Sequence, residues 1–265
     1  TDLGGDVAPE PTGILDLDAE ENPLADFSMV VVPYCTGDLH LGTTTHDYGD
    51  GVVVEHRGFD NASTAAGATA ALFPDATEVV VAGSSAGSAS APAFGGGAHD
   101  LWPDADIAVV ADASAAYPGT PDITLAIGGL WGVSDAIPLW PETADLPLEA
   151  WSLPGLFVNA ATHDPELRFA TFNDAFDETQ ATFSELIGVD PSNLVELIDV
   201  NNRSIAEEGV DIVSWVSPGQ EHTILRSDAL YDEEVGDERF VEWLTAFLAG
   251  DEVTDVHCTD CEPPA

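Results

Sequence analysis

Six short and largely apolar runs, most of them rich in valine, constrain the fold of this chain more than any other feature. They lie at residues 27–33, 52–56, 78–82, 107–111, 156–159 and 212–216. Continuous apolar runs of this length are typical of strands that are buried on both faces of a sheet. Strands that alternate with helices pair in parallel, so the sequence predicts an α/β fold with a mainly parallel sheet and helices on both faces.

Helical patterns separate several of these runs. A helix is predicted over residues 61–72, because Asn61 is a good N-cap, alanine-rich sequence follows it and Pro74 comes soon after. Residues 117–153 interrupt the alternation with proline, glycine and tryptophan, which predicts an irregular insertion that caps a site. Three further helices are predicted at about residues 171–187, 191–208 and 238–248.

The length of 265 residues predicts a single domain with irregular ends. Residues 1–26 are acidic and rich in proline and glycine, and residues 251–265 form an acidic tail with Cys258 and Cys261. Two cysteines are half of a zinc site, so we expect no metal there but a local disulfide, or a bond from one of them to Cys35. The sequence contains no run of about 18 apolar residues, so no membrane span is expected.

The balance of charge excludes several classes of partner. The chain has 49 Asp and Glu residues against 5 Lys and Arg, which gives a formal net charge of −44. So few basic residues cannot build a cationic face for nucleic acid or for anionic lipid. The hydrophobic share of 45% suffices for a core, so we do not predict disorder. Molar salt screens surface repulsion, and the composition therefore predicts a protein adapted to brine, with an ordinary acidic protein as the alternative.

The strongest chemical motif is Gly83-Ser84-Ser85-Ala86-Gly87, which follows the predicted strand at residues 78–82 and opens a helical stretch. It is Gly-x-Ser-x-Gly in the strand–turn–helix setting of a nucleophile elbow. Such a turn exposes the Ser85 hydroxyl at a helix N-terminus, where the Ala86 N–H and the helix dipole can stabilise a developing oxyanion. The alternative is a turn of small residues that packs a helix on a sheet.

A nucleophilic serine needs a base, and the base needs an orienting acid. After an elbow of this kind the acid comes next along the chain and the histidine comes last, each in a loop after a strand. Asp164 comes just after the predicted strand at residues 156–159, and His222 follows the predicted strand at 212–216. The sequence therefore predicts a triad of Ser85, Asp164 and His222.

Three other residues are alternatives for these roles. Asp112 follows the predicted strand at residues 107–111 and is a second candidate for the acid. His163 adjoins Asp164 but precedes it, which the expected order disfavours as the base. His257 lies beyond the last predicted helix, too late in the chain.

A second group of polar residues lies in a predicted loop. Asp38 and His40, followed by His46 and Asp47, could share a metal, because Asp and His two positions apart on a loop can reach one ion. Nothing else in the sequence requires a metal. We therefore expect this loop to form the rim of the active site.

Together these motifs resemble the pectin acetylesterase family, which includes the Notum-type carboxylesterases. The resemblance rests on residues 32–40, 56–59, 80–87 and 159–164 and on the late loop with His222. It implies an α/β-hydrolase fold and a secreted serine esterase that needs no cofactor. By matching position, Ser85 would be the nucleophile, Asp164 the acid and His222 the base, and Ala86 would supply one oxyanion-hole N–H.

The resemblance also implies a substrate. The expected reaction removes an acetyl or other short acyl group from a polysaccharide or a related ester. The tryptophans of the insertion could line a pocket for that substrate or belong to the core. The residues expected to line the pocket are Ser84, Tyr34, Asp38, His40 and Trp131.

One departure from the family pattern concerns the oxyanion hole. The glycine-rich segment that supplies the first donors in the family has no counterpart in residues 1–26. We therefore expect either that the chain lacks this segment, which would leave Cys35 without its partner, or that the hole is built differently. The alternatives to an esterase are a hydrolase-like binding protein without activity, and a depolymerase or peptidase of the same fold.

Overall fold

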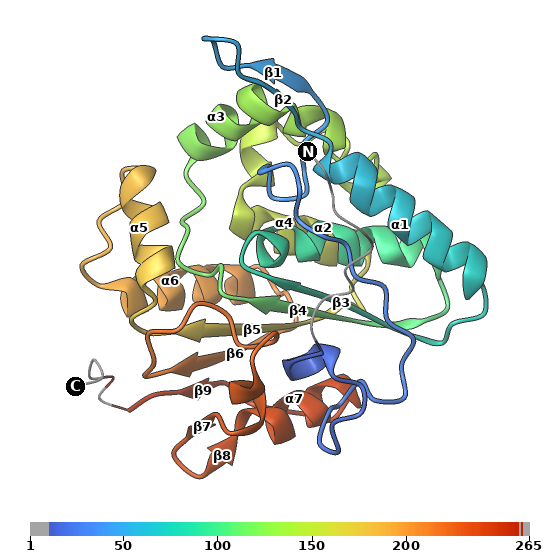
Figure 1. Cartoon of the computed structure of the whole chain (residues 1–265), viewed down its shortest axis with the longest axis vertical. Coiled ribbons are helices and arrows are strands. Elements are labelled where there is room, and N and C mark those ends of the chain that lie inside the picture. The colour runs from blue at the N-terminus through green and yellow to red at the C-terminus, as the bar shows by residue number, and fades with distance from the viewer. Residues whose placement is uncertain (1–10, 260, 262–265) are drawn as a thin grey trace.

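The centre of the molecule is a five-stranded sheet of order β3-β4-β5-β6-β9, in which each pair of neighbouring strands is parallel (Figure 1). The computed structural model describes residues 11–259 and 261. The predicted α/β fold with a mainly parallel sheet is therefore confirmed. The strands are β3 (Glu78–Ser84), β4 (Asp106–Asp112), β5 (Arg168–Asp174), β6 (Ile212–Ser217) and β9 (Val256–His257).

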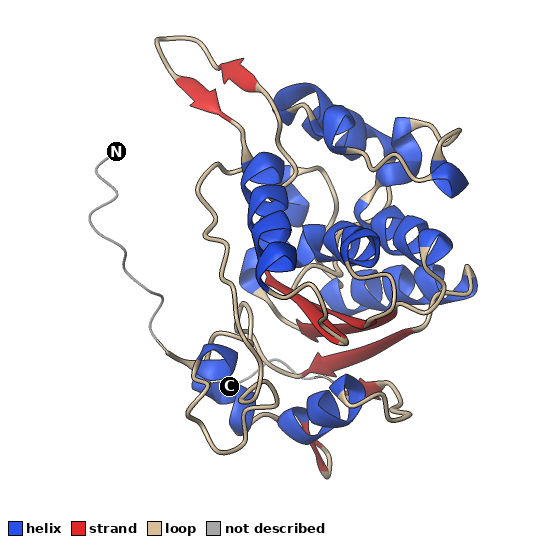
Figure 2. Cartoon of the chain, turned by 90° about the vertical axis from the view of Figure 1, so that its right-hand side faces the viewer, coloured by secondary structure: helices blue, strands red, loops and turns tan. Residues whose placement is uncertain are grey.

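Helices cover both faces of this sheet (Figure 2). Successive side chains of a strand point to opposite faces, so Val109 and Phe169 pack in one apolar cluster and Val110 and Phe172 in another. The first cluster includes residues of α2, α4 and α6, and the second includes residues of α7. The helices are α1 (Gly58–Leu72), α2 (Ala86–Leu101), α3 (Pro121–Trp131), α4 (Leu153–His163), α5 (Glu178–Leu186), α6 (Leu194–Glu207) and α7 (Phe240–Leu248).

Shorter elements complete the fold. β1 (Thr45–Asp47) and β2 (Val53–Glu55) form an antiparallel hairpin that projects from the top of the molecule in Figure 1. β7 (Glu234–Val235) and β8 (Glu238–Arg239) form a second hairpin before α7. The 3-10 helices are η1 (Gly13–Leu15), η2 (Val133–Ala136), η3 (Pro141–Thr143), η4 (Leu148–Trp151) and η5 (Asp228–Tyr231).

Two predicted elements have the wrong type. Residues 156–159 lie inside α4 and are not a strand, because the Ser152 hydroxyl caps the helix by accepting the Gly155 N–H at 3.2 Å. An apolar run cannot by itself distinguish a buried helix from a buried strand. Residues 171–174 belong to β5, and the helix predicted there begins only at Glu178, where the Asp177 side chain is the N-cap.

Two further predicted strands lie outside the central sheet. Residues 27–33 form no strand, and residues 53–55 pair only with β1. The segment predicted as an insertion, residues 117–153, contains α3 and the 3-10 helices η2, η3 and η4. Its Trp140 and Trp151 are buried in the first apolar cluster, so these two tryptophans belong to the core.

The two ends of the chain were predicted to be irregular. Residues 1–10 lie outside the described residues, and residues 16–44 contain turns and extended segments without a helix or strand. Cys258 and Cys261 form the local disulfide that was one of the two expected pairings, and Cys35 is free and exposed. None of the helices in the described ranges is long and apolar enough to cross a membrane.

Candidate active site

The motif around Ser85 forms a sharp turn between a strand and a helix. β3 ends at Ser84 and α2 begins at Ala86, and Ser85 between them has φ 55° and ψ −116°. A left-handed φ is uncommon for a residue other than glycine, and such strain is typical of a nucleophile elbow. Glycine is required at position 83, because a Cβ there would collide with the backbone of Gly87 and Ser88.

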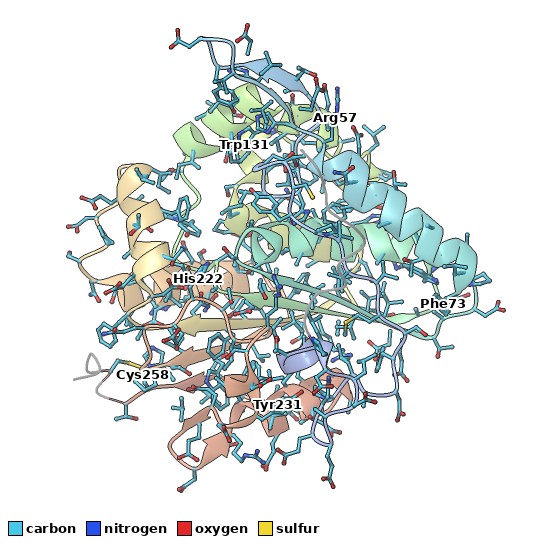
Figure 3. The ribbon with its side chains drawn as sticks, in the orientation of Figure 1. Arg57, Phe73, Trp131, His222, Tyr231 and Cys258 are labelled. Carbon is cyan, nitrogen blue, oxygen red and sulfur yellow. A yellow bond between two sulfur atoms is a disulfide. The ribbon has the colours of Figure 1, made fainter. Side chains whose placement is uncertain are left out.

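His222 joins this serine to a carboxylate. Its Nε2 lies 2.7 Å from the Ser85 Oγ, and its Nδ1 lies 2.7 Å from the Asp177 Oδ2. His222 is in the loop that follows β6, near the C-terminal ends of the strands (Figure 3). The structure therefore brings two of the predicted residues, Ser85 and His222, into direct contact.

The carboxylate of Asp177 is held in place by several hydrogen bonds. It lies in the loop after β5 and is fully buried. One carboxylate oxygen accepts the N–H groups of Thr179 and Gln180 at 2.8 and 2.9 Å, as the N-cap of α5. The other accepts the Gln180 side-chain amide at 3.1 Å as well as His222. The carboxylate that contacts the histidine is thus fixed by hydrogen bonds to both of its oxygens.

The prediction that Asp164 contacts His222 is wrong. Asp164 follows α4 and precedes β5, so it lies at the opposite end of the strand from Asp177. Its carboxylate pairs with the His99 Nδ1 at 3.1 Å and accepts the Glu166 N–H at 3.0 Å. The error follows from taking residues 156–159 as a strand, because the residue after such a strand would have been at the C-terminal edge.

His163 and His257, the two alternative histidines for the role of base, have other carboxylate partners. His163 is bound between Asp100 and Glu142, at 3.1 Å from each. His257 lies 3.3 Å from Asp199. Among the described residues, the side chains of His257, Cys258 and Cys261 lie close enough together to hold a metal ion. The sulfur atoms of both cysteines are, however, bonded to each other in the disulfide.

Ala86 and Ser84 adjoin the nucleophile but differ in what they can do. Ala86 is the first residue of α2, so its N–H has no acceptor within the helix and points from the positive end of the helix dipole. The Ser84 hydroxyl donates to the Asp112 Oδ2 at 2.7 Å. Ala86 therefore keeps the position predicted for an oxyanion donor, whereas the hydroxyl of Ser84 is already used within the protein.

The other residues expected to line the pocket form a separate cluster. The buried Asp38 accepts the N–H groups of Gly58 and His40 at 2.8 and 3.2 Å, and so caps the start of α1. The ring of Tyr34 lies 4.9 Å from that of His40, and its hydroxyl accepts the Leu39 N–H at 3.0 Å. These contacts hold residues 34–58 together and do not include Ser85, His222 or Asp177.

Trp131 belongs to the same region. Its ring lies 6.2 Å from that of His56, and its carbonyl accepts the Thr43 N–H at 2.9 Å. Figure 3 shows it beside the β1–β2 hairpin, well separated from His222. The contacts of Trp131 therefore connect the insertion to the hairpin.

Two buried carboxyl groups near His222 have raised pKa values. Burial, and after it the nearby charges of Glu233 and Asp177, raise the pKa of Asp174 to about 7. Burial also raises the pKa of Asp112 to about 6, against the hydrogen bonds that it accepts from Ser84 and from the backbone of Leu225 and Ile224. Strongly shifted pKa values are common at functional sites, because such sites bury ionisable groups close to one another.

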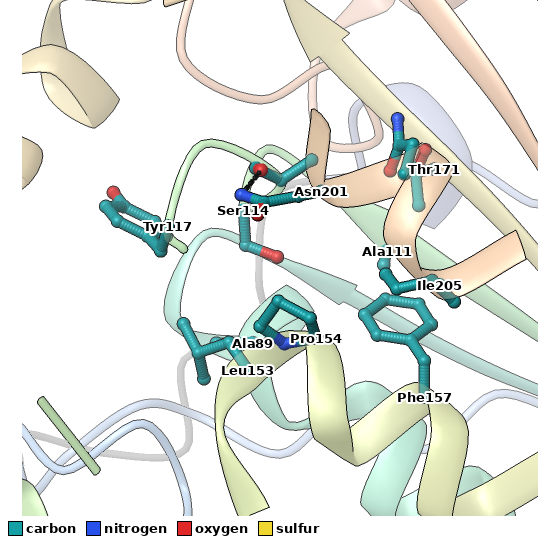
Figure 4. A pocket seen from close by; sticks show the side chains of 12 residues that line it. Ala89, Ala111, Ser114, Tyr117, Leu153, Pro154, Phe157, Thr171, Asn201 and Ile205 are labelled. Atoms are coloured by element: carbon teal, nitrogen blue, oxygen red, sulfur yellow. Dashed lines mark hydrogen bonds between the residues drawn. The ribbon is translucent and has the colours of Figure 1, made fainter. Parts of the chain in front are cut away.

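A small, mainly apolar pocket lies next to the elbow (Figure 4). Ala89 lines it, and the Ala89 N–H donates to the Ser85 carbonyl at 3.2 Å, so the pocket begins one helical turn from the serine. Tyr117, Leu153 and Phe157 supply apolar walls. The apolar space is therefore near the turn that carries Ser85, although Ser85 itself does not line it.

Comparison with known proteins supports the fold. No known family model and no curated protein matches this sequence. One solved structure, the Wnt deacylase Notum from Drosophila in crystal form II, is similar with a TM-score of 0.63 and 17% identity over 97% of this chain and 77% of that chain. Crystal form I of the same protein gives a TM-score of 0.66 and 16% identity over 100% and 81%. The chain therefore has an α/β-hydrolase-like fold, as the resemblance to the pectin acetylesterase family implied.

Proposed function

We propose that this protein is a serine hydrolase of carboxylic esters that works through an acyl-enzyme intermediate. The observation that carries the proposal is the continuous chain of contacts from Asp177 through His222 to Ser85, with the serine on a strained turn. Serine, histidine and aspartate in this geometry convert a weak nucleophile into a strong one. The fold shared with a protein named as a deacylase supports the same chemistry.

In the first half of the reaction the Ser85 Oγ attacks the ester carbonyl. His222 Nε2 takes the serine proton, and the Asp177 carboxylate accepts the Nδ1–H and stabilises the imidazolium. The oxyanion of the tetrahedral intermediate accepts the Ala86 N–H at the positive end of α2. His222 then donates the proton to the departing alkoxide, which leaves as the alcohol.

Water completes the cycle. His222 Nε2 takes a proton from the water as it attacks the acyl-enzyme, and it returns that proton to the Ser85 Oγ when the carboxylic acid leaves. We propose acetyl and similar short acyl esters as substrates, with the alcohol a sugar or a related compound, because the resemblance of the sequence motifs to the pectin acetylesterase family implies this class.

The test is the hydrolysis of p-nitrophenyl acetate in molar salt by the wild type and by Ser85→Ala. The substitution is expected to lower kcat on the order of 10⁶-fold, because the nucleophile is lost. Ser90→Ala is the matched control, because Ser90 is a buried serine of α2, the helix that follows Ser85, and its hydroxyl donates to the Gly87 carbonyl at 3.2 Å. Equal rates for Ser85→Ala and the wild type would exclude the esterase and favour a hydrolase-like binding protein.

A further inference from the structure

Asp112 contacts both halves of the candidate catalytic apparatus. It is the last residue of β4, fully buried, and β4 lies beside β3, the strand that leads into the elbow. Its main-chain carbonyl accepts the Ser85 N–H at 2.8 Å, and its carboxylate accepts the Ser84 hydroxyl at 2.7 Å. These two bonds fix the turn that carries the nucleophile.

The same carboxylate binds the loop of the base. It accepts the Ile224 N–H at 3.0 and 3.1 Å from its two oxygens and the Leu225 N–H at 3.1 Å. These residues come directly after His222 and Thr223. One side chain therefore connects the segment of Ser85 to the segment of His222.

The loop of the base needs such an anchor. Thr223 has φ 76°, in the left-handed region that a β-branched residue rarely adopts. A strained conformation of this kind persists only where the surrounding structure determines it. The two N–H groups that follow Thr223 are held by Asp112, so the carboxylate supports the strained residue that places the His222 side chain.

The chemistry of the contacts requires a carboxylate. All three groups that point at the Asp112 side chain are donors, namely one hydroxyl and two N–H groups. An ionised carboxylate offers only acceptors, whereas an amide at this position would turn an N–H₂ group toward some of those donors. A neutral isostere therefore cannot reproduce the contacts.

We infer that Asp112 is a positioning residue, which sets the distance between the Ser85 Oγ and the His222 Nε2 by holding both segments at once. It is not the acid of the triad, because the Nδ1 of His222 already contacts Asp177. This role rests on the proposed function, since a positioning residue matters only if Ser85 and His222 react. It differs from the role of acid that the sequence left open for Asp112.

The experiment compares Asp112→Asn with the wild type on p-nitrophenyl acetate, with the melting temperature measured for each. The expected result is a fall in kcat of about 10²-fold with little change in KM, because a small misplacement of reacting groups costs about that factor. Asp164→Asn is the matched control, a buried aspartate that also accepts a backbone N–H but lies at the far end of β5. A folded Asp112→Asn protein with the wild-type kcat would overturn the inference.

Ser84→Ala gives a second test if Asp112→Asn does not fold. The substitution removes one hydrogen-bond donor to Asp112, so the pKa of that carboxyl rises. Because positioning needs the ionised carboxylate, the fall of kcat on the acidic side of its pH profile should move to higher pH. The other groups that face this region, His222, Asp174, Asp177 and Glu233, are the same in both proteins. If the acidic side of the kcat profile lies at the same pH in Ser84→Ala and the wild type, the inference is overturned.

The two failures can be told apart. A wild-type protein without esterase activity, matched by Ser85→Ala, would contradict the proposed function itself. An active wild type whose kcat survives Asp112→Asn would leave the esterase intact and remove only the positioning role.

Discussion

Two histidine–aspartate pairs lie at opposite ends of the central sheet, and they differ in what surrounds them. At the C-terminal ends of the strands, His222 lies 2.7 Å from Asp177 and 2.7 Å from the Ser85 Oγ. At the N-terminal ends, His99 lies 3.1 Å from Asp164, and its ring lies 5.5 Å from the ring of a second histidine, His163. A histidine beside an aspartate is therefore not enough to define a catalytic site.

Helix α2 connects the two ends. Ser85 immediately precedes its first residue, and His99 is in its last turn. The helix dipole presents partial positive charge at the serine, which favours a developing oxyanion, and partial negative charge at the end that contains His99. The same helix thus supports the proposed reaction at one end and a histidine–aspartate contact at the other.

Within this comparison, the largest expected effect is the difference between substitutions at the two aspartates. Asp177→Asn should lower kcat by about 10⁴-fold, because an amide no longer stabilises the tautomer in which His222 Nε2 accepts the serine proton. Asp164→Asn should leave kcat unchanged, since Asp164 contacts His99 and not His222. Initial rates with p-nitrophenyl acetate measure both variants, and melting curves confirm that each is folded. A larger loss for Asp164→Asn would reverse the assignment.

The same comparison explains what the sequence could and could not predict. The strands at residues 78–82, 107–111 and 212–216 were predicted correctly because their apolar runs are continuous, and they place Ser85 and His222. β5 was predicted as part of a helix because Thr171, Asn173 and Asp174 break its apolar pattern. All three are buried, and Asn173 accepts the Ala115 N–H and the Gln180 amide near the site.

The missing acid therefore has a physical cause. Strands that end in a functional site carry buried polar residues, and these disrupt the pattern by which a strand is recognised. Once β5 is known to end at Asp174, Asp177 becomes the candidate acid in the next loop, and it satisfies the expected order of serine, acid and histidine. The elbow could be predicted because its signal is local, whereas Asp177 depends on the end of another strand.

Gly83, in the elbow before α2, and Gly97, near the C-terminal end of α2, should change the stability of the protein in opposite directions when replaced by alanine. Gly83→Ala should destabilise the protein by about 1–3 kcal/mol, because the added Cβ collides with the Gly87 backbone in the elbow. Gly97→Ala, near the His99 end of α2, meets open space and should stabilise the helix by about 0.5–1 kcal/mol. Denaturant unfolding measures both free energies. Equal effects of the two substitutions would show that the elbow is not as tightly packed as its contacts indicate.

The smallest effect concerns pH, and it arises at the C-terminal end of the sheet. The folded state raises the pKa of Asp174 to about 7 from its usual value of 3.8, first through burial and then through the charges of Glu233 and Asp177. The folded protein consequently binds this proton more tightly than the unfolded chain does. Stability from this group is therefore complete at low pH and is lost as the pH rises through about 7.

Melting temperatures in constant salt should accordingly fall between about pH 4 and about pH 7, where the unfolded chain has lost this proton and the folded protein still holds it. Asp112, whose pKa is raised to about 6, contributes to the same slope. Asp174→Asn removes the larger of the two titrations and should flatten the slope, because an amide resembles the protonated carboxyl that the folded state prefers. If melting temperature depends on pH equally in Asp174→Asn and the wild type, the pH dependence does not come from Asp174. The buried carboxyl groups of Asp174 and Asp112 would then not distinguish the C-terminal end of the sheet from the other end.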